Sequence, residues 1–302
     1  MAASGAGVIA VCLAVLTWSV TRPAAPQPPG ASAAPAARSV RAAATGPESP
    51  GLAAPALVRV TARRETLADC EARLERAPSG IPTMAVVGAS FTAGEGPGNA
   101  ALSWAVLLAR ALRWNAVVYG VPGAGYTHAG SGGQGTVARM LARLDLRALA
   151  PSLVLVQAGH DDGGVPAAVE RQHVTQVIAA IRAAAPRARV ALLTVFAGSA
   201  RPSRALYRTN DAIIAAGIAA DPGAIIMNPL GDGWHFARAR DGLHPTAAGD
   251  AWIARTAAAI LRAHGVLPAA GRTPVAPVIC DSGVGSGAGA RAGTAPRSPR
   301  FQ

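Results

Sequence analysis

The chain has 302 residues, of which 51% are hydrophobic, so it is long enough to bury one or two substantial cores. Its formal net charge is +12, yet every one of its 28 basic residues is arginine and only 4% of its residues are aromatic. Much of the excess charge lies in the terminal segments, and no basic stripe or base-stacking platform is visible. Composition therefore argues against nucleic acid as a partner.

The N-terminal residues 1–20 contain the apolar run GAGVIAVCLAVLTWSV. The run is long enough for the core of a signal peptide and, counted from Met1, for a bilayer span of about 20 residues. No basic residue precedes it and Arg22 follows it, which departs from the usual signal pattern. We expect export, with the protein either secreted after cleavage or anchored by this segment to the outer face of the cell membrane.

Two further segments lack apolar periodicity. Residues 21–66 are rich in proline and alanine, and residues 283–302 are rich in glycine, alanine and serine. Such compositions predict a disordered linker and a disordered tail. The domain is therefore predicted at residues 67–282, with its core at 82–266.

The three cysteines have different settings. Cys12 lies in the apolar segment and follows Val11 rather than the small residue of a lipid-attachment site, so we interpret it as a small buried residue. Cys70 and Cys280 flank the predicted core. In an oxidising compartment these two are expected to form a disulfide.

Short apolar runs alternate with helical patterns across the core. Each run is long enough for a buried strand and too short for a helix, and the runs lie at residues 84–90, 116–120, 152–159, 189–196 and 224–230. Helical spacing occupies residues 99–114, 135–150, 165–185, 203–220 and 246–265. This alternation predicts a three-layer α/β/α fold around a five-stranded, parallel, flavodoxin-like sheet.

In such a sheet, ligands bind beyond the carboxyl ends of the strands, so polar residues directly after the apolar runs are the candidates for chemistry. Ser90 follows the first run, between Gly88 and Gly94. The glycines would expose its hydroxyl and leave backbone N–H groups free near a helix start. An ordinary N-capping serine would give the same pattern.

The segment RDGLHPTAAGD favours a nucleophile, because it places Asp241 and His244 after the fifth run and before the last helix. A neutral imidazole can take a hydroxyl proton near neutral pH, and a carboxylate can fix the ring tautomer and stabilise the imidazolium. Ser90, His244 and Asp241 are therefore a candidate catalytic triad.

With these residues placed, residues 82–266 resemble the SGNH (GDSL-type) hydrolase family of esterases and lipases. The family's first block reads GASFTAG here, with Ser90 at the nucleophile position and Ala89 where an aspartate is usual. The last block matches DGLH residue for residue. The resemblance implies that Ser90 attacks the ester, that His244 is the base and that Asp241 orients it.

The resemblance also implies an oxyanion hole. The Ser90 N–H would be one donor, and the glycine of the second block is best matched by Gly123 in VVYGVPGAGYT, with Gly125 as a less favoured register. The third block, G-x-N-D, reads GHDD, so Asp161 stands where an asparagine amide normally donates. Because an ionised carboxylate only accepts, we expect Asp161 to be protonated or to point elsewhere.

Three other motifs have alternative interpretations. GSGGQG at residues 130–135 satisfies G-x-G-x-x-G but does not directly follow a strand, so we interpret it as a loop. The absence of lysine excludes a Walker A site. His160, Asp161 and Asp162 are adjacent on a turn and cannot all face one ion, so we expect neither a metal nor another cofactor.

The substrate pocket is less clearly marked. We expect Tyr126, His160 and Trp234 to line it, although Trp234 and its neighbour Phe236 would serve equally well as packing residues. No lid-sized apolar insertion is present, and a shallow cleft suits short acyl or O-acetyl esters on small molecules or polymers.

The sequence thus predicts an exported serine hydrolase that cleaves carboxylic esters through an acyl-enzyme and acts as a monomer. The alternative is a noncatalytic surface module that binds glycan or lipid in the same cleft, motivated by Asp161 and the long linker. A nucleotide-binding protein is a third interpretation, which rests on residues 130–135 alone.

Overall fold

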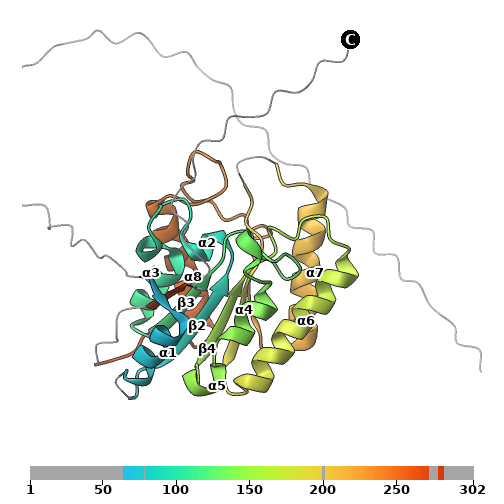
Figure 1. Cartoon of the computed structure of the whole chain (residues 1–302). Helices are drawn as coiled ribbons and strands as arrows, with labels where there is room; N and C mark the ends of the chain where they lie inside the picture. The colour runs from blue at the N-terminus through green and yellow to red at the C-terminus, as the bar shows by residue number, and fades with distance from the viewer. Residues whose placement is uncertain (1–63, 78, 199–200, 272–277, 282–302) are drawn as a thin grey trace, which may run out of the picture. The chain divides into compact units, whose positions relative to one another are not determined.

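The computed structural model describes residues 64–77, 79–198, 201–271 and 278–281 (Figure 1). The predicted signal or anchor segment, the linker as far as residue 63 and the predicted tail at 283–302 lie outside the described residues. Among the helices that are described, none is both long and apolar enough to cross a membrane.

The described residues form one sheet of seven parallel strands in the order β1-β7-β3-β2-β4-β5-β6. The strands are β1 (Arg64–Thr66), β2 (Thr83–Gly88), β3 (Asn115–Gly120), β4 (Leu153–Gln157), β5 (Arg189–Leu193), β6 (Ile225–Met227) and β7 (Val278–Asp281). Strands β2 to β6 are the five that the apolar runs predict. Their order is the flavodoxin-like one, so the predicted fold class is confirmed.

Helices cover both faces of this sheet (Figure 1). One face carries α1 (Leu67–Glu75), α4 (Val137–Arg143), α5 (Leu146–Leu149), α6 (Ala167–Ala184) and α7 (Arg204–Ala220), and the other carries α2 (Ser90–Ala93), α3 (Trp104–Leu112) and α8 (Ala247–Ala263). Successive strand residues point to opposite faces, so Val87 and Tyr119 pack in the first layer and Val86 and Val118 in the second. Two separate apolar cores result.

Two predicted helices are interrupted by residues that cap helices. The pattern at 135–150 contains α4 and α5, because the Asp145 carboxylate accepts from two backbone N–H groups and starts a new helix there. The pattern at 99–114 contains a 3₁₀ turn and then α3, separated by the extended residue Ser103. Helical periodicity survives such breaks because the apolar face continues across them.

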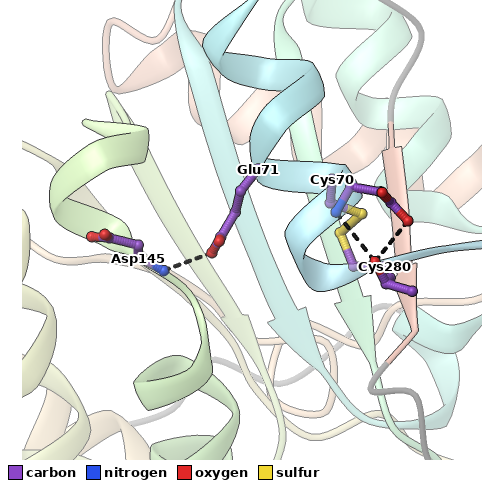
Figure 2. The surroundings of a disulfide bond; sticks show 6 residues. Cys70, Glu71, Asp145 and Cys280 are labelled. Atoms are coloured by element: carbon purple, nitrogen blue, oxygen red, sulfur yellow. Dashed lines mark hydrogen bonds between the residues drawn. A yellow bond between two sulfur atoms is a disulfide. The ribbon is translucent and has the colours of Figure 1, made fainter.

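The two short strands β1 and β7 extend the sheet beyond β3 and were not predicted. Strand β7 pairs with both β1 and β3, so segments from the two flanks of the core lie side by side. Cys70 of α1 and Cys280 of β7 are joined by a disulfide beside this edge (Figure 2). Formation of that bond in exported protein stays a prediction.

Candidate active site

Ser90 is the first residue of α2 and directly follows the turn at the end of β2. The N-cap position belongs to Ala89, and Ser90 does not act as a cap. The Ser90 side chain is largely buried, and its Oγ lies 2.8 Å from His244 Nε2. The capping interpretation is therefore not supported, and the hydroxyl instead faces the His244 imidazole.

The turn that carries Ser90 is fixed by Gln157, the buried last residue of β4. Its Oε1 accepts from the Ala89 N–H at 3.2 Å and from Thr92 Oγ1 at 2.9 Å. A Cβ on Gly88 would lie 2.3 Å from Thr92 Oγ1, so only glycine fits at that position. Sequence analysis missed Gln157, although a polar residue ending an apolar strand was a visible signal.

His244 and Asp241 come from the loop between β6 and α8. Asp241 Oδ2 lies 2.7 Å from His244 Nδ1, while Asp241 Oδ1 accepts from the backbone N–H groups of Leu243 and His244 at 2.8 and 3.0 Å. The Leu243 N–H contributes most to lowering the pKa of Asp241, and the hydrogen bond with the His244 side chain adds to this. An ionised carboxylate only accepts, so Nδ1 carries the proton and Nε2 turns its lone pair toward Ser90.

The predicted oxyanion donors differ in whether their backbone N–H groups already have a partner. Within the described residues, the N–H groups of Ser90 and Gly123 have no hydrogen-bond partner, whereas the Gly125 N–H donates to the His128 carbonyl at 3.0 Å. Gly123 has a φ of 72°, which glycine adopts without strain. The geometry thus favours Gly123 over Gly125 in the predicted register.

The two adjacent aspartates after β4 differ in their surroundings. Asp162 is buried and accepts from the N–H groups of Tyr126, Thr127 and His128 and from the Thr127 hydroxyl, at 2.6 to 3.2 Å. It therefore holds the loop after Gly123, a role that the sequence did not reveal. Asp161 is partly exposed, and burial is the main cause that raises its pKa.

The three predicted substrate-binding residues differ in exposure. Tyr126 and Trp234 are only 1% and 7% exposed, so both rings are buried, and their contact with a substrate stays a prediction. Trp234 packs edge-on against Phe196 and Trp252, with ring centroids 6.2 and 5.7 Å apart. His160 is partly exposed, and burial lowers its pKa. It stays a candidate for substrate contact.

An aromatic cluster packs beneath the triad. Phe91, the residue after the nucleophile, stacks on Phe196 at 4.3 Å, and its ring lies 5.3 Å from that of His244. Phe236 meets Phe196 edge to face at 5.6 Å. These rings pack against one another, and the contact with Phe91 helps to hold the His244 ring.

Glu95 is a further acidic residue at the site that sequence analysis missed. Its Oε2 lies 3.5 Å from His244 Nε2, and its backbone N–H donates to the Ser90 carbonyl at 3.0 Å. The imidazole is therefore flanked by a carboxylate on each side. Among the described residues, no cluster of three potential metal-binding side chains is present.

Comparison with protein families decides the identity of the domain. A sequence model described as the GDSL-like lipase/acylhydrolase family matches residues 86–252, which include Ser90, Asp241 and His244. The chain belongs to this family. It is accordingly an ester-hydrolysing enzyme, and the alternatives of a noncatalytic module and a nucleotide-binding protein are not retained. A search of curated proteins found no match.

Solved structures of carbohydrate esterases share the fold. A family two carbohydrate esterase from Clostridium thermocellum in complex with cellohexaose is 18% identical, with a TM-score of 0.52 over 63% of this chain and 67% of that chain. An active-site mutant of a family two carbohydrate esterase from the same organism is 17% identical, with a TM-score of 0.52 over 62% and 65%. At these identities the likeness is one of fold.

Proposed function

We propose that this GDSL-like acylhydrolase is an exported serine esterase that cleaves short acyl or O-acetyl esters through an acyl-enzyme. The observation that carries the proposal is the unbroken hydrogen-bonded line from Asp241 Oδ2 through His244 to Ser90 Oγ, with contacts of 2.7 and 2.8 Å. Nucleophile, base and orienting carboxylate at such distances are the arrangement that activates a serine hydroxyl.

The reaction follows from these contacts. Ser90 Oγ attacks the ester carbonyl as His244 Nε2 takes its proton, and Asp241 stabilises the resulting imidazolium. The N–H groups of Ser90 and Gly123 donate to the developing oxyanion. His244 then gives the proton to the leaving alcohol, and a water molecule, deprotonated in turn by His244, hydrolyses the acyl-enzyme.

Two observations support a short acyl group and an exposed or polymeric alcohol. The aromatic cluster of Phe91, Phe196, Trp234 and Phe236 occupies the space beneath the triad, so little room remains there for a long buried acyl chain. The similar fold from Clostridium thermocellum is a carbohydrate esterase in complex with cellohexaose, which supports an O-acylated sugar as the substrate. Export is supported by the apolar N-terminal run and by the Cys70–Cys280 disulfide.

Hydrolysis of p-nitrophenyl acetate and labelling by a fluorophosphonate test the proposal. We expect the parent to hydrolyse the ester and to be labelled at Ser90 alone, and we expect Ser90→Ala to lose both properties. The control is Ser152→Ala, because Ser152 is exposed just before β4, at the opposite end of the strands. Labelling that persists in Ser90→Ala would overturn the assignment of the nucleophile.

A further inference from the structure

Glu95 faces the edge of His244 that exchanges protons with the substrate. Asp241 holds the Nδ1 edge of the ring, whereas Glu95 Oε2 lies 3.5 Å from Nε2, beside the Ser90 hydroxyl. This second contact is too long for a good hydrogen bond. The Glu95 carboxylate is therefore near the reacting atoms without being a member of the hydrogen-bonded line.

The backbone fixes Glu95 in this position. The flanking residues Gly94 and Gly96 have φ values of 79° and 99°, which glycine adopts readily and other residues rarely do. A Cβ on Gly94 would lie 2.7 Å from Ala100 Cα, and one on Gly96 would lie 2.2 Å from the Pro245 carbonyl oxygen. The turn thus packs directly against the segment that follows His244, so its position is set by the same contacts that set the triad.

The Glu95 carboxylate is also accessible. Its side chain is 45% exposed, and no hydrogen bond to its carboxylate oxygens is found among the described residues. An exposed carboxylate without a protein donor can accept a hydrogen bond from a bound ligand without first breaking another contact.

The chemistry of ester cleavage determines which part of a substrate lies beside Glu95. The leaving alcohol oxygen receives its proton from His244 Nε2 and must approach that atom to about 3 Å. Because Glu95 Oε2 is 3.5 Å from the same atom, the leaving oxygen lies within about 6.5 Å of the carboxylate. The acyl carbonyl oxygen is directed instead toward the N–H groups of Ser90 and Gly123.

On the basis of the proposed function, we infer that Glu95 is a specificity-determining residue that recognises the alcohol part of the ester. Its carboxylate accepts a hydrogen bond from a hydroxyl on the carbon next to the ester-bearing carbon, as in a polyol or a sugar. It also disfavours alcohols that carry a negative charge. The expected alcohol is thus a neutral vicinal diol, a class that the triad alone does not specify.

Three acetate esters with the same acyl group separate this role from general catalysis. Ethylene glycol monoacetate has the vicinal hydroxyl, propyl acetate replaces that hydroxyl with a methyl group, and acetoxyacetate replaces the hydroxymethyl group with a carboxylate. The parent is expected to prefer the hydroxyl ester to propyl acetate by about tenfold in kcat/KM, the size of one hydrogen bond to a charged acceptor. Acetoxyacetate is expected to be the poorest substrate.

The variants Glu95→Ala and Glu95→Gln then address the hydrogen bond and the charge. We expect Glu95→Ala to lose the preference for the hydroxyl ester, measured as the ratio of kcat/KM for the hydroxyl ester to kcat/KM for propyl acetate. We expect Glu95→Gln to improve the hydrolysis of acetoxyacetate. The matched control is Glu75→Gln, because Glu75 is exposed at the end of α1 near Thr83, at the amino end of β2.

The possible results distinguish a failure of the inference about Glu95 from a failure of the proposed function. An unchanged ratio of the two neutral esters in Glu95→Ala, with hydrolysis still dependent on Ser90, would overturn the inference and leave the proposed function intact. An equal loss of activity on all three esters would also overturn it, since Glu95 would then act on the common chemical step. Hydrolysis that survives Ser90→Ala would instead remove the proposed function itself.

Discussion

Gln157 Oε1 and Thr92 Oγ1 are hydrogen-bonded at 2.9 Å, which ties the carboxyl end of β4 to α2, the helix that begins at Ser90. The same oxygen accepts from the N–H of Ala89, the residue before Ser90. Both side chains are buried, so these bonds are shielded from water. The position of Ser90 is therefore set by the neighbouring strand as well as by its own.

Gln157→Ala is expected to lower both stability and turnover. It leaves the buried Thr92 hydroxyl without its acceptor, which should cost about 1–3 kcal/mol of unfolding free energy, and it loosens the turn that aims Ser90 at His244. Urea denaturation and kcat on p-nitrophenyl acetate measure the two effects. Gln176→Ala, at an exposed position on α6, is the control. A Gln157→Ala protein with parental kcat would show that packing alone fixes the turn.

Asp241→Asn is expected to reduce kcat by about 10⁴, the loss seen in a serine protease when the wrong histidine tautomer results. Asparagine keeps an oxygen that can accept from the N–H groups of Leu243 and His244, so the turn should survive. Its amide would donate to Nδ1 and so place the proton on Nε2. Asp232→Asn, at an exposed loop position, controls for loss of a surface charge. A fall of less than tenfold would contradict the orienting role.

Asp161→Asn is expected to equal or exceed the parent in kcat, because an amide donates to the oxyanion at every pH. Burial raises the pKa of Asp161, so a neutral, donating carboxyl is lost as pH rises through that value. Any alkaline fall in kcat that comes from ionisation of Asp161 should be absent in Asp161→Asn. Asp161→Ala cannot donate and should be slower than Asp161→Asn, by up to about 10²–10³. An alanine variant faster than the asparagine variant would mean that GHDD is misaligned.

The Cys70–Cys280 bond is expected to persist in exported protein and to contribute strongly to stability. The two cysteines are 210 residues apart, and chain-entropy models assign about 5 kcal/mol to the closure of so large a loop. Urea denaturation of a Cys70→Ser, Cys280→Ser double variant measures the effect. Thiol titration of unfolded, never-reduced mature protein checks the bond itself. Two reactive thiols at these positions would disprove the pairing.

Glu170 is expected to make stability depend on pH. It is fully buried on α6, neither of its carboxylate oxygens has a hydrogen-bond partner among the described residues, and burial raises its pKa to about 8. The folded protein keeps a proton that the unfolded chain releases near pH 4.3. Stability should therefore fall as pH rises from about 4.3 to about 8, by up to about 1.4 kcal/mol per unit for this group.

Glu170→Gln removes the titrating group and should flatten this dependence in urea denaturation measured between pH 5 and pH 8. Part of the slope should remain, because burial also raises the pKa of Asp250 to about 8. Asp250 is thus an internal reference in both proteins. Identical slopes for the parent and Glu170→Gln would contradict a contribution from Glu170.

The parts of the fold that could be predicted are those that local pattern determines. Strands β2 to β6 are buried on both faces and read as apolar runs, and the ends of these strands locate Ser90, Asp241 and His244. Strand β1 has the sequence RET, with no apolar residue, and β7 has the sequence VICD, with three, so neither forms an apolar run like those of β2 to β6. Cys70 of α1 and Cys280 of β7 were visible in the sequence, but the strand conformation of β1 and β7 was not.

The residues that surround the triad were harder to predict, because the direction of a side chain depends on tertiary packing. Tyr126 follows a strand, as an accessible residue would, yet the loop held by Asp162 turns its ring into the core. Glu95 lies five positions after Ser90, but its approach to His244 depends on two glycines with positive φ. Gln157 acts on a turn 65 positions away along the chain. None of these contacts produces a periodic pattern of residues that could be recognised in the sequence.

The pairing of Cys70 with Cys280 also has a mechanical consequence (Figure 2). When the chain is pulled from positions before 70 and after 280, the force passes from one cysteine to the other through covalent bonds. Strands β2 to β6 and the loops that carry Ser90, Asp161 and His244 all lie within that closed loop. If the chain before Cys70 were held in place and force were applied to the chain after Cys280, the fold between them would carry none of the load. Reduction of the Cys70–Cys280 disulfide would transfer the full force to the sheet.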